Sequence, residues 1–591
     1  MNVKKVAKRI AILGAGPSGL FMFKRLVEAN RTDWEIDIFE THHQLGAGMP
    51  YSTDGACKEH VTNVSGNEIP ALVTSLQQWL PTLPEATLDQ FGIDRNRFNE
   101  YKVVPRLLFG QYLAAQFDLL RQQAAQAGLI TRLHLGCTIA DIVDQPDDQQ
   151  VDVVVADRGR FSFDSVVICT GHYWPKKHEG KIPNYFDSPY PPAKLAFKAD
   201  HPVALKGASL TAIDAIRTLA RRNGQFNPQP DGTLLFDPDP ASLHFKLVMH
   251  SRNGLLPAIR FHLEESLLSQ DELLSAEQIA AQRAANDGFV PLDYVFENTF
   301  KASFRQSDPA FYEKIKAMKL EDFVESVMDQ RERHDPFDLF KAEYKEAEQS
   351  IRRQQSVPWK EQLAVLSYAM NYPAKYFSAE DSLRLQKVLM PLISLVIAFV
   401  PQSSAKELLA LHQAGVLEIR SVGADSSVEP QQSGGATYQY ADENDQPQSD
   451  FYQTFVDCTG QPHLPFEDFP FKSLIATKTV SPARLKFQSA QRGASAMADG
   501  NESVEQDSDG TYWLNVPGIA INDNFQLVGS DGATHPRLFI MAVPFIGGYN
   551  PDYSGLDFCE TASARIVERM LKVTKLQFVK DLTEVKNKIS G

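Results

Sequence analysis

A glycine triplet near the start of the chain restricts its fold more than any other sequence feature. Gly14, Gly16 and Gly19 follow a short apolar run and precede a helical pattern, with Pro17 and Ser18 inside the turn. This spacing lets a strand turn sharply into a helix and lets backbone N–H groups approach a pyrophosphate at the helix N-terminus. The five residues are therefore predicted to bind a dinucleotide.

A carboxylate stands where the second strand of such a unit would end. The apolar run Ile36 to Glu40 follows the predicted helix, and an acidic side chain at this point can bind ribose hydroxyls. The order strand, glycine loop, helix, strand and acid predicts a βαβ opening. An ordinary glycine turn is the alternative, and it leaves this order unexplained.

The same order of features occurs a second time. Gln126-Ala127-Gly128 matches Gln413-Ala414-Gly415, and Cys169-Thr170-Gly171 matches Cys458-Thr459-Gly460, at similar spacing. We therefore expect a duplicated nucleotide-binding unit, although chance agreement of two tripeptides is the competing explanation. The second opening loop is predicted at Gly207, Ser209 and Thr211, where Ser209 replaces the second glycine and weakens the case for close backbone approach.

Charge and cysteine usage exclude several classes of protein. The formal charge of −15 argues against a nucleic-acid surface. Five well-separated cysteines form no CxxC pair and no metal-type spacing, which favours a reducing, cytoplasmic location and predicts no metal site. The longest apolar stretch, Val388 to Val400, contains Pro391 and is shorter than the roughly 20 residues that span a bilayer, so no membrane association is expected.

Several segments together resemble the bacterial FAD-NAD(P)-binding flavoproteins, whose relatives include flavin N-hydroxylating monooxygenases and a urate hydroxylase. They are ILGAGPSGL at 12–20, Glu40, GAGMPYS at 46–52, VVICTGH at 166–172 and SRNGLLP at 251–257. The resemblance covers most of the chain. It implies an α/β fold with two Rossmann-like dinucleotide-binding domains, a discontinuous FAD domain enclosing an NAD(P)H domain.

The chain of 591 residues is long enough for several domains. We place the first part of the FAD domain at 1–200, the NAD(P)H domain at 201–460 and the closing part of the FAD domain at 461–591. Surplus length in the second half predicts a helical insertion at about 261–370. Helical periodicity dominates there, for example at Phe311 to Met328 and Phe340 to Arg352.

The resemblance also implies further cofactor contacts. Gly48 and Tyr51 would lie in the loop that passes the flavin, Arg106 would contact FAD, and backbone amides after the last strand would stabilise the reduced flavin. Arg252 follows a predicted strand and would meet the 2′-phosphate of NADP. A surface arginine is the alternative for both Arg106 and Arg252. The remaining predicted cofactor residues are Thr170, Gly171, Gly547 and Gly548.

Catalytic residues are left open by the sequence. The candidates are polar residues near predicted loops, and each is individually as well explained by a structural hydrogen bond. They are His60, Asn63, His172 and Asp552, with Asn67, Tyr173, Tyr549 and Asn550 beside them.

The expected function is that of an FAD-dependent oxidoreductase that uses NADPH or NADH. The leading hypothesis is a monooxygenase, in which a C4a-hydroperoxyflavin formed with O₂ hydroxylates a small organic substrate. One alternative is an NAD(P)H dehydrogenase that passes electrons to a quinone or a protein acceptor. A second is a non-catalytic FAD-binding sensor or assembly protein. The oligomeric state is left open.

Overall fold

A six-stranded sheet is built from the two ends of the chain. The computed structural model describes residues 7–264, 273–442, 444–552 and 555–589. The strand order is β21-β22-β7-β1-β2-β3, and all neighbours are parallel except β21 and β22. The bounds are β1 (Lys8–Leu13), β2 (Trp34–Glu40), β3 (Ile130–Leu135), β7 (Ser165–Ile168), β21 (Gln526–Val528) and β22 (Thr534–Ile540).

A five-stranded parallel sheet is formed by the middle of the chain, in the order β13-β12-β9-β17-β8. Its strands are β8 (Tyr185–Phe186), β9 (Pro202–Lys206), β12 (Lys246–Ser251), β13 (Leu417–Ser421) and β17 (Thr454–Asp457). Because β8 belongs to it, this sheet begins before residue 201.

The two parallel sheets share the same spatial order of strands, and four of the five strands also follow the same chain order; the fifth differs, because β22 follows β7 in the chain whereas β8 precedes β9. The order β3-β2-β1-β7-β22 corresponds position by position to β13-β12-β9-β17-β8. Each parallel sheet with its connecting segments forms one nucleotide-binding unit, called the first and the second unit in chain order. In each unit, a three-stranded antiparallel meander stands before the fourth strand. The first meander is β4 (Ile139–Gln145), β5 (Gln150–Val155) and β6 (Gly159–Phe163); the second is β14 (Ser427–Pro430), β15 (Ala436–Ala441) and β16 (Pro447–Tyr452). The predicted pair of Rossmann-like parallel sheets is thus confirmed.

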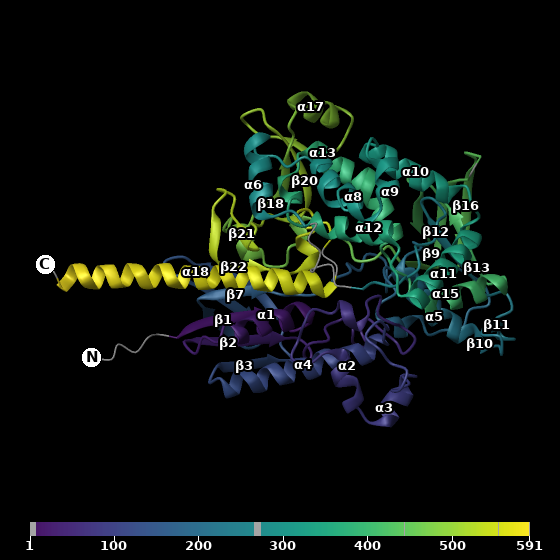
Figure 1. The fold of residues 1–591 in the computed structure, drawn as a ribbon, viewed down its shortest axis with the longest axis horizontal. Coiled ribbons are helices and arrows are strands. Elements are labelled where there is room, and N and C mark those ends of the chain that lie inside the picture. Colours follow the sequence, from purple (N-terminus) through teal and green to yellow (C-terminus); the bar gives the residue numbers. More distant parts are fainter. Residues whose placement is uncertain (1–6, 265–272, 443, 553–554, 590–591) are drawn as a thin grey trace.

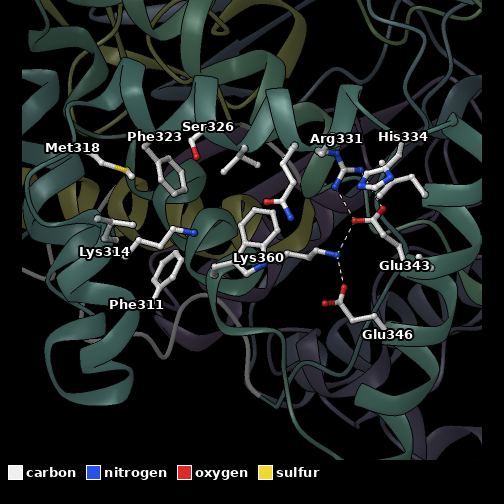
Figure 2. A pocket seen from close by; sticks show the side chains of 16 residues that line it. Phe311, Lys314, Met318, Phe323, Ser326, Arg331, His334, Glu343, Glu346 and Lys360 are labelled. Carbon is white, nitrogen blue, oxygen red and sulfur yellow. Dashed lines mark hydrogen bonds and ion pairs between the residues drawn. The ribbon is translucent and has the colours of Figure 1, made fainter.

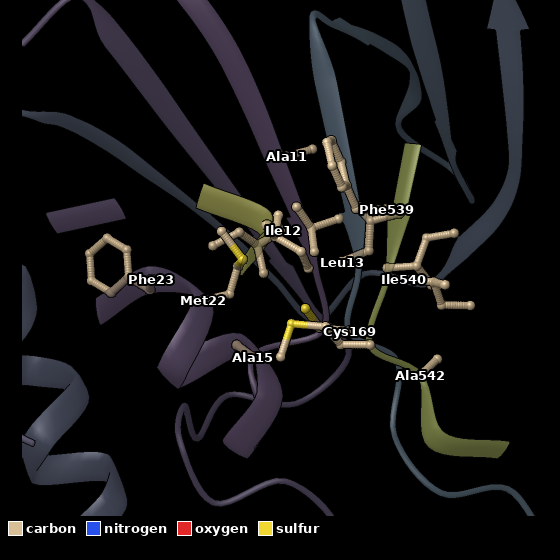
Figure 3. Packing of buried hydrophobic residues seen from close by; sticks show 14 of the residues in the cluster. Ala11, Ile12, Leu13, Ala15, Met22, Phe23, Cys169, Phe539, Ile540 and Ala542 are labelled. Atoms are coloured by element: carbon tan, nitrogen blue, oxygen red, sulfur yellow. The ribbon is translucent and has the colours of Figure 1, made fainter. Parts of the chain in front are cut away.

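Three helices pack side by side on the first sheet. Helix α1 (Pro17–Glu28) contacts β1, α4 (Arg106–Gln126) and α18 (Gly555–Ile589). The Lys24 ammonium on α1 is buried and bonds to the Glu560 carboxylate on α18 at 2.9 Å. In Figure 1, α18 extends past β1 toward the side where both chain ends lie. Figure 3 shows side chains of α1, β1 and β22 meeting in the core.

The second sheet carries its own helices and hydrophobic core. Helix α5 (Leu210–Asn223) follows β9 as α1 follows β1, and α15 (Gln402–Gln413) precedes β13 as α4 precedes β3. The other elements of these two units are β10 (Gly224–Pro228), β11 (Leu234–Pro238), η1 (Gly66–Glu68), α2 (Leu76–Trp79), η2 (Leu80–Thr82), α3 (Glu85–Gln90) and η3 (Pro192–Leu195).

A helical region with a separate core lies between β12 and α15. It continues to Val396, beyond the predicted end near residue 370, because the apolar run after Val388 folds as a buried helix that begins at Met390 and accommodates Pro391 in its first turn. The bounds are α6 (Ala276–Ala285), α7 (Leu292–Val295), η5 (Phe296–Lys301), α8 (Phe304–Ser307), α9 (Pro309–Ile315), α10 (Leu320–Glu332), α11 (Pro336–Arg353), α12 (Pro358–Ala369), η6 (Ala374–Tyr376), α13 (Ala379–Arg384), η7 (Leu385–Leu389) and α14 (Met390–Val396).

The closing segment adds a small antiparallel sheet in the order β18-β20-β19. Its elements, with the short helices around it, are η8 (Phe466–Asp468), α16 (Lys472–Ala476), β18 (Pro482–Lys486), α17 (Ala490–Ala498), β19 (Val504–Gln506), β20 (Tyr512–Ile519) and η9 (Val543–Phe545). None of the helices in the described part of the chain has both the length and the apolar character that crossing a membrane requires.

Candidate functional site

The first glycine loop is held by backbone contacts that exclude larger residues. Gly14 has a φ of +101°, and a Cβ there would lie 2.5 Å from the carbonyl oxygen of Cys169. A Cβ on Gly19 would collide with the carbonyl oxygen of Gly14. The first and third glycines are therefore required by the turn and by the packing of α1 against it.

A second segment closes over this loop. The Gly46 N–H donates to the Ala15 carbonyl at 2.7 Å, and a Cβ on Gly16 would lie 3.2 Å from the Cα of Gly48. A Cβ on Gly48 would lie 2.9 Å from the ring of Pro17. The predicted residues of the two segments thus form one narrow cradle of backbone atoms, while the Ser18 hydroxyl contacts the Cys559 thiol on α18 at 3.5 Å.

Two predicted polar side chains, Glu40 and Thr170, lie at the ends of strands beside the first loop, and their cofactor contacts stay predictions. The Glu40 carboxylate accepts hydrogen bonds from the Ala15 N–H at 2.7 Å and the His42 N–H at 3.0 Å, at the end of β2. Thr170 and Gly171 follow β7, and the buried Thr170 hydroxyl has no hydrogen-bond partner among the described residues. An acceptor or donor from a bound cofactor would satisfy that hydroxyl.

Tyr51 packs against α4, and Arg106, the first residue of α4, contacts α5 of the second unit. The Tyr51 ring packs edge-on against Phe109, and burial raises the pKa of its hydroxyl to about 12. The Arg106 guanidinium pairs with the Asp214 carboxylate on α5 at 2.5 Å, while Tyr190 donates to the same carboxylate at 2.8 Å. Arg106 therefore has a partner in the second unit, and its contact with FAD stays a prediction.

The second loop reproduces the backbone geometry of the first. Gly207 has a φ of +112°, and a Cβ there would lie 2.8 Å from the Cys458 carbonyl, as Gly14 lies against Cys169. Ser209 stands at the N-cap of α5 without a side-chain cap bond, so its hydroxyl is not used by the helix. Thr211 faces Gly460, where a Cβ would lie 3.7 Å from the threonine hydroxyl.

The register of the second unit places a serine where the first unit has its acid. The Gly14 N–H donates to Phe39, the residue before Glu40, and the Gly207 N–H donates to His250, the residue before Ser251. The Ser251 hydroxyl is buried without a partner among the described residues. The guanidinium of Arg252 also has no hydrogen bond or ion pair in that part of the chain. A serine and a free cation thus replace the carboxylate at this position.

The two units meet at the residues that follow their Cys-Thr-Gly segments. The His172 Nδ1–H donates to the Gln461 amide oxygen at 3.0 Å, and the Tyr173 N–H donates to the same oxygen at 2.9 Å. Burial lowers the pKa of His172, which keeps the ring neutral. His172 and Gln461 hold equivalent positions in the two units, because each follows a Cys-Thr-Gly segment. The contact between the units is therefore nearly symmetric. Sequence reasoning missed Gln461, although its place after the second Cys-Thr-Gly was available as a signal.

The other catalytic candidates take part in structural hydrogen bonds. His60 is fully buried; its Nδ1 accepts from the Cys57 N–H, and its Nε2 lies 3.1 Å from both the Asp214 carbonyl and the Thr218 hydroxyl. The Asn63 carbonyl accepts from the Arg260 guanidinium. The backbone of Asp552 bonds to the Asn371 side chain of the helical region. The bonds of His60 use its side chain, whereas those of Asn63 and Asp552 are made by backbone atoms. The catalytic roles of all three residues stay predictions.

The closing glycines differ from expectation in one respect. The Gly548 N–H donates to the Pro517 carbonyl of β20 at 2.9 Å. This amide is therefore not available to a flavin, contrary to the prediction. Gly547 packs against the ring of His463, where a Cβ would collide. Close packing against Pro517 and His463 therefore explains why both positions are glycine. Among the described residues, no group of three His, Cys, Asp or Glu side chains is arranged to hold a metal ion.

This chain has distant likenesses among solved structures. The FAD-bound cadaverine monooxygenase DfoA of Erwinia amylovora is 12% identical with a TM-score of 0.42, over 95% of this chain and 93% of that one. Lysine monooxygenase NbtG of Nocardia farcinica is 12% identical with a TM-score of 0.38, over 95% and 99%. Thioredoxin reductase of T. acidophilum is 9% identical with a TM-score of 0.34, over 95% and 98%. TM-scores this low do not bear on activity.

Sequence comparisons are more specific. Residues 275–397 match the YdhS-like middle domain, and residues 11–173 match the FAD-NAD(P)-binding family. The uncharacterized protein YdhS of Escherichia coli (strain K12) is 29% identical over 476 residues, which cover 79% of this chain and 86% of that protein. The chain is thus similar to the FAD-NAD(P)-binding family over residues 11–173 and to the YdhS-like middle domain over residues 275–397.

Proposed function

We propose that this protein is an FAD-dependent oxidoreductase that takes hydride from NADPH and uses O₂ to hydroxylate a small organic substrate. One observation carries the proposal: two loops of the same backbone geometry, at Gly14 and Gly207, belong to units that meet at the His172–Gln461 hydrogen bond. Two nucleotides bound at adjoining units are what hydride transfer between them requires.

The first loop fits FAD. Its glycines allow close backbone packing, the N-terminus of α1 begins at Gly16 without a side-chain cap, Glu40 stands at the ribose position, and the Thr170 hydroxyl lacks a partner among the described residues. When bound, FAD supplies the hydride acceptor. The protein's part is to position the two cofactors and to exclude water between them.

The second loop favours NADPH over NADH. A carboxylate at the end of the second strand would bind the ribose hydroxyls of NADH and repel a 2′-phosphate, but Ser251 occupies that position. Arg252 adds a guanidinium without a partner in the described part of the chain. A phosphate accepts hydrogen bonds from such a group with favourable charge.

Cysteine chemistry argues against disulfide reduction as the second half-reaction. All five cysteines are free, and burial raises the pKa of each thiol, most strongly for Cys169 and Cys458. The thiolate is the reactive form, so these thiols are poor nucleophiles at neutral pH. O₂ with an organic substrate is the acceptor we propose, and a quinone or a protein acceptor is the second candidate.

Anaerobic reduction followed by a choice of acceptor tests the proposal. The purified protein should carry FAD, and NADPH should bleach the flavin absorbance faster than NADH. Reoxidation by O₂ but not by menadione supports the oxygenase, whereas reoxidation by menadione alone supports the dehydrogenase. A protein that holds flavin but is reduced by neither nucleotide is a binding protein, and a colourless protein without extractable flavin contradicts the proposal altogether.

A further inference from the structure

A cavity of about 330 Å³ lies within the helical region, among α9, α10, α11 and α12. Its volume is in the range that small-molecule sites occupy. All of its lining residues fall between 311 and 360, whereas the nucleotide loops begin at Gly14 and Gly207. It is therefore a site distinct from the two cofactor loops.

Helix α12 runs from this cavity to α18 of the first sheet. Trp359 and Lys360 line the cavity at the start of α12, and Tyr368 near its end bonds to the Thr561 hydroxyl on α18 at 2.8 Å. With a rise of 1.5 Å per residue, the eight residues from Lys360 to Tyr368 span roughly 12 Å. The cavity and the contacts with α18 are thus at opposite ends of one rigid element.

One end of the cavity is a network of paired charges, all buried except the half-exposed Glu346 carboxylate. The Arg331 guanidinium forms two hydrogen bonds to the Glu343 carboxylate, at 2.7 and 3.1 Å. The Lys360 ammonium bonds to Glu343 at 2.8 Å and to Glu346 at 2.7 Å. Two cations face two carboxylates, so this end carries no net charge. The Arg331 Nε is nevertheless buried without an acceptor among the described residues.

The other end combines aromatic walls with an unmatched cation. Figure 2 shows the Lys314 side chain passing between Phe311 and Phe323 toward the middle of the cavity. Lys314 has no carboxylate partner among the described residues, unlike its neighbour Lys316, which pairs with Glu313. Trp359 supplies a third aromatic surface. The cavity therefore presents one net positive charge beside a set of aromatic rings.

We propose that this cavity is a binding site for an aromatic monocarboxylate. The aromatic body lies among Phe311, Phe323 and Trp359, and the carboxylate meets the Lys314 ammonium. The paired charges at the far end fix the shape of the site without attracting a second ion, because they balance each other. Aromatic rings and a carboxylate are the complement of this lining in both shape and charge.

Titration calorimetry with the full-length protein tests the site, with 4-phenylbutyrate as the probe and the neutral alcohol 4-phenylbutanol for comparison. We expect the carboxylate to bind more tightly than the alcohol. The change Lys314→Met should weaken 4-phenylbutyrate about three- to fivefold, as for a solvent-exposed ion pair, and leave 4-phenylbutanol unchanged. Lys316→Met is the matched control and should alter neither.

A second variant fills the cavity instead of changing its charge. Ala342 lines the cavity from an exposed position on α11, so Ala342→Trp occupies the space without disturbing a packed core. Binding of both compounds should fall below detection, while the thermal unfolding midpoint stays that of the parent. Failure of 4-phenylbutyrate to bind at millimolar concentration, equal effects of Lys314→Met and Lys316→Met, or full binding by Ala342→Trp would each overturn the proposal.

Discussion

The ion pair between Arg106 and Asp214 should be a main determinant of how the two nucleotide-binding units are held together. The side chains are 15% and 5% exposed, and they join α4 of the first unit to α5 of the second. Tyr190 donates to the same carboxylate. The change Asp214→Asn leaves the guanidinium buried without its counter-charge and preserves the size of the side chain.

The expected cost follows from burial. Removing one partner of a buried ion pair destabilises a protein by about 3–5 kcal/mol, because the remaining charge is uncompensated. The asparagine oxygen can still accept a hydrogen bond, so we expect a loss of about 3 kcal/mol in the free energy of unfolding. Replacing both residues, Arg106→Met with Asp214→Leu, removes the stranded charge and should recover most of that loss.

Urea unfolding followed by circular dichroism measures these differences. Asp200→Asn is the control, since Asp200 is an exposed aspartate that bonds to His244, and its unfolding midpoint should match the parent. A loss below about 1 kcal/mol for Asp214→Asn, the value for an exposed pair, would refute the reasoning. The reasoning would also be refuted if the double variant lost as much free energy of unfolding as Arg106→Met and Asp214→Leu lose in sum.

The same pair predicts a pH dependence. Burial alone would raise the pKa of Asp214, but the Arg106 guanidinium, His60 and the Tyr190 hydroxyl together outweigh burial and hold the pKa below the ordinary 3.8. The folded state then binds fewer protons than the unfolded state at acid pH. The stabilisation is present above pH 3.8 and is lost as the pH falls through the lowered pKa. Asp214→Asn should lack this component of acid unfolding.

Three further changes test the cofactor loops and the core of the second unit. Gly14→Ala should abolish flavin retention, measured by the ratio of flavin to protein absorbance, whereas Gly207→Ala should keep the flavin and lose reduction by NADPH; retention of flavin by Gly14→Ala would contradict the first-loop geometry. Arg252→Gln should raise the KM for NADPH about tenfold or more and leave that for NADH unchanged, and equal effects on both nucleotides would remove Arg252 from the 2′-phosphate site. Burial lowers the pKa of His250 from 6.5 to about 4. As the pH falls from 6.5 to 4, the unfolded state therefore binds a proton that the folded state does not, and the free energy of unfolding should fall by about 3 kcal/mol. His250→Phe should flatten this dependence of the urea midpoint, and an unchanged slope would show that His250 does not cause it.

Periodicity predicts the presence of helices better than their ends. The pattern at Phe340 to Arg352 corresponds to most of α11, but the pattern at Phe311 to Met328 covers two helices, α9 and α10. Ile315 and Leu320 are both buried at the break, so each helix directs its own apolar residue into the core. An unbroken apolar period does not reveal such a break, because the period is the same on both sides of it.

Local backbone requirements are what the sequence by itself determined. A positive φ at Gly14 and Gly207 and close approach at Gly19 need glycine whatever surrounds them, so the loops and the duplicated units are visible in the residue pattern. Only the tertiary structure decided which distant groups meet: Arg106 with Asp214, His172 with Gln461, and Ser251 at the position of Glu40. These relations depend on strand register and domain packing between segments far apart in the chain, and local sequence carries no record of either.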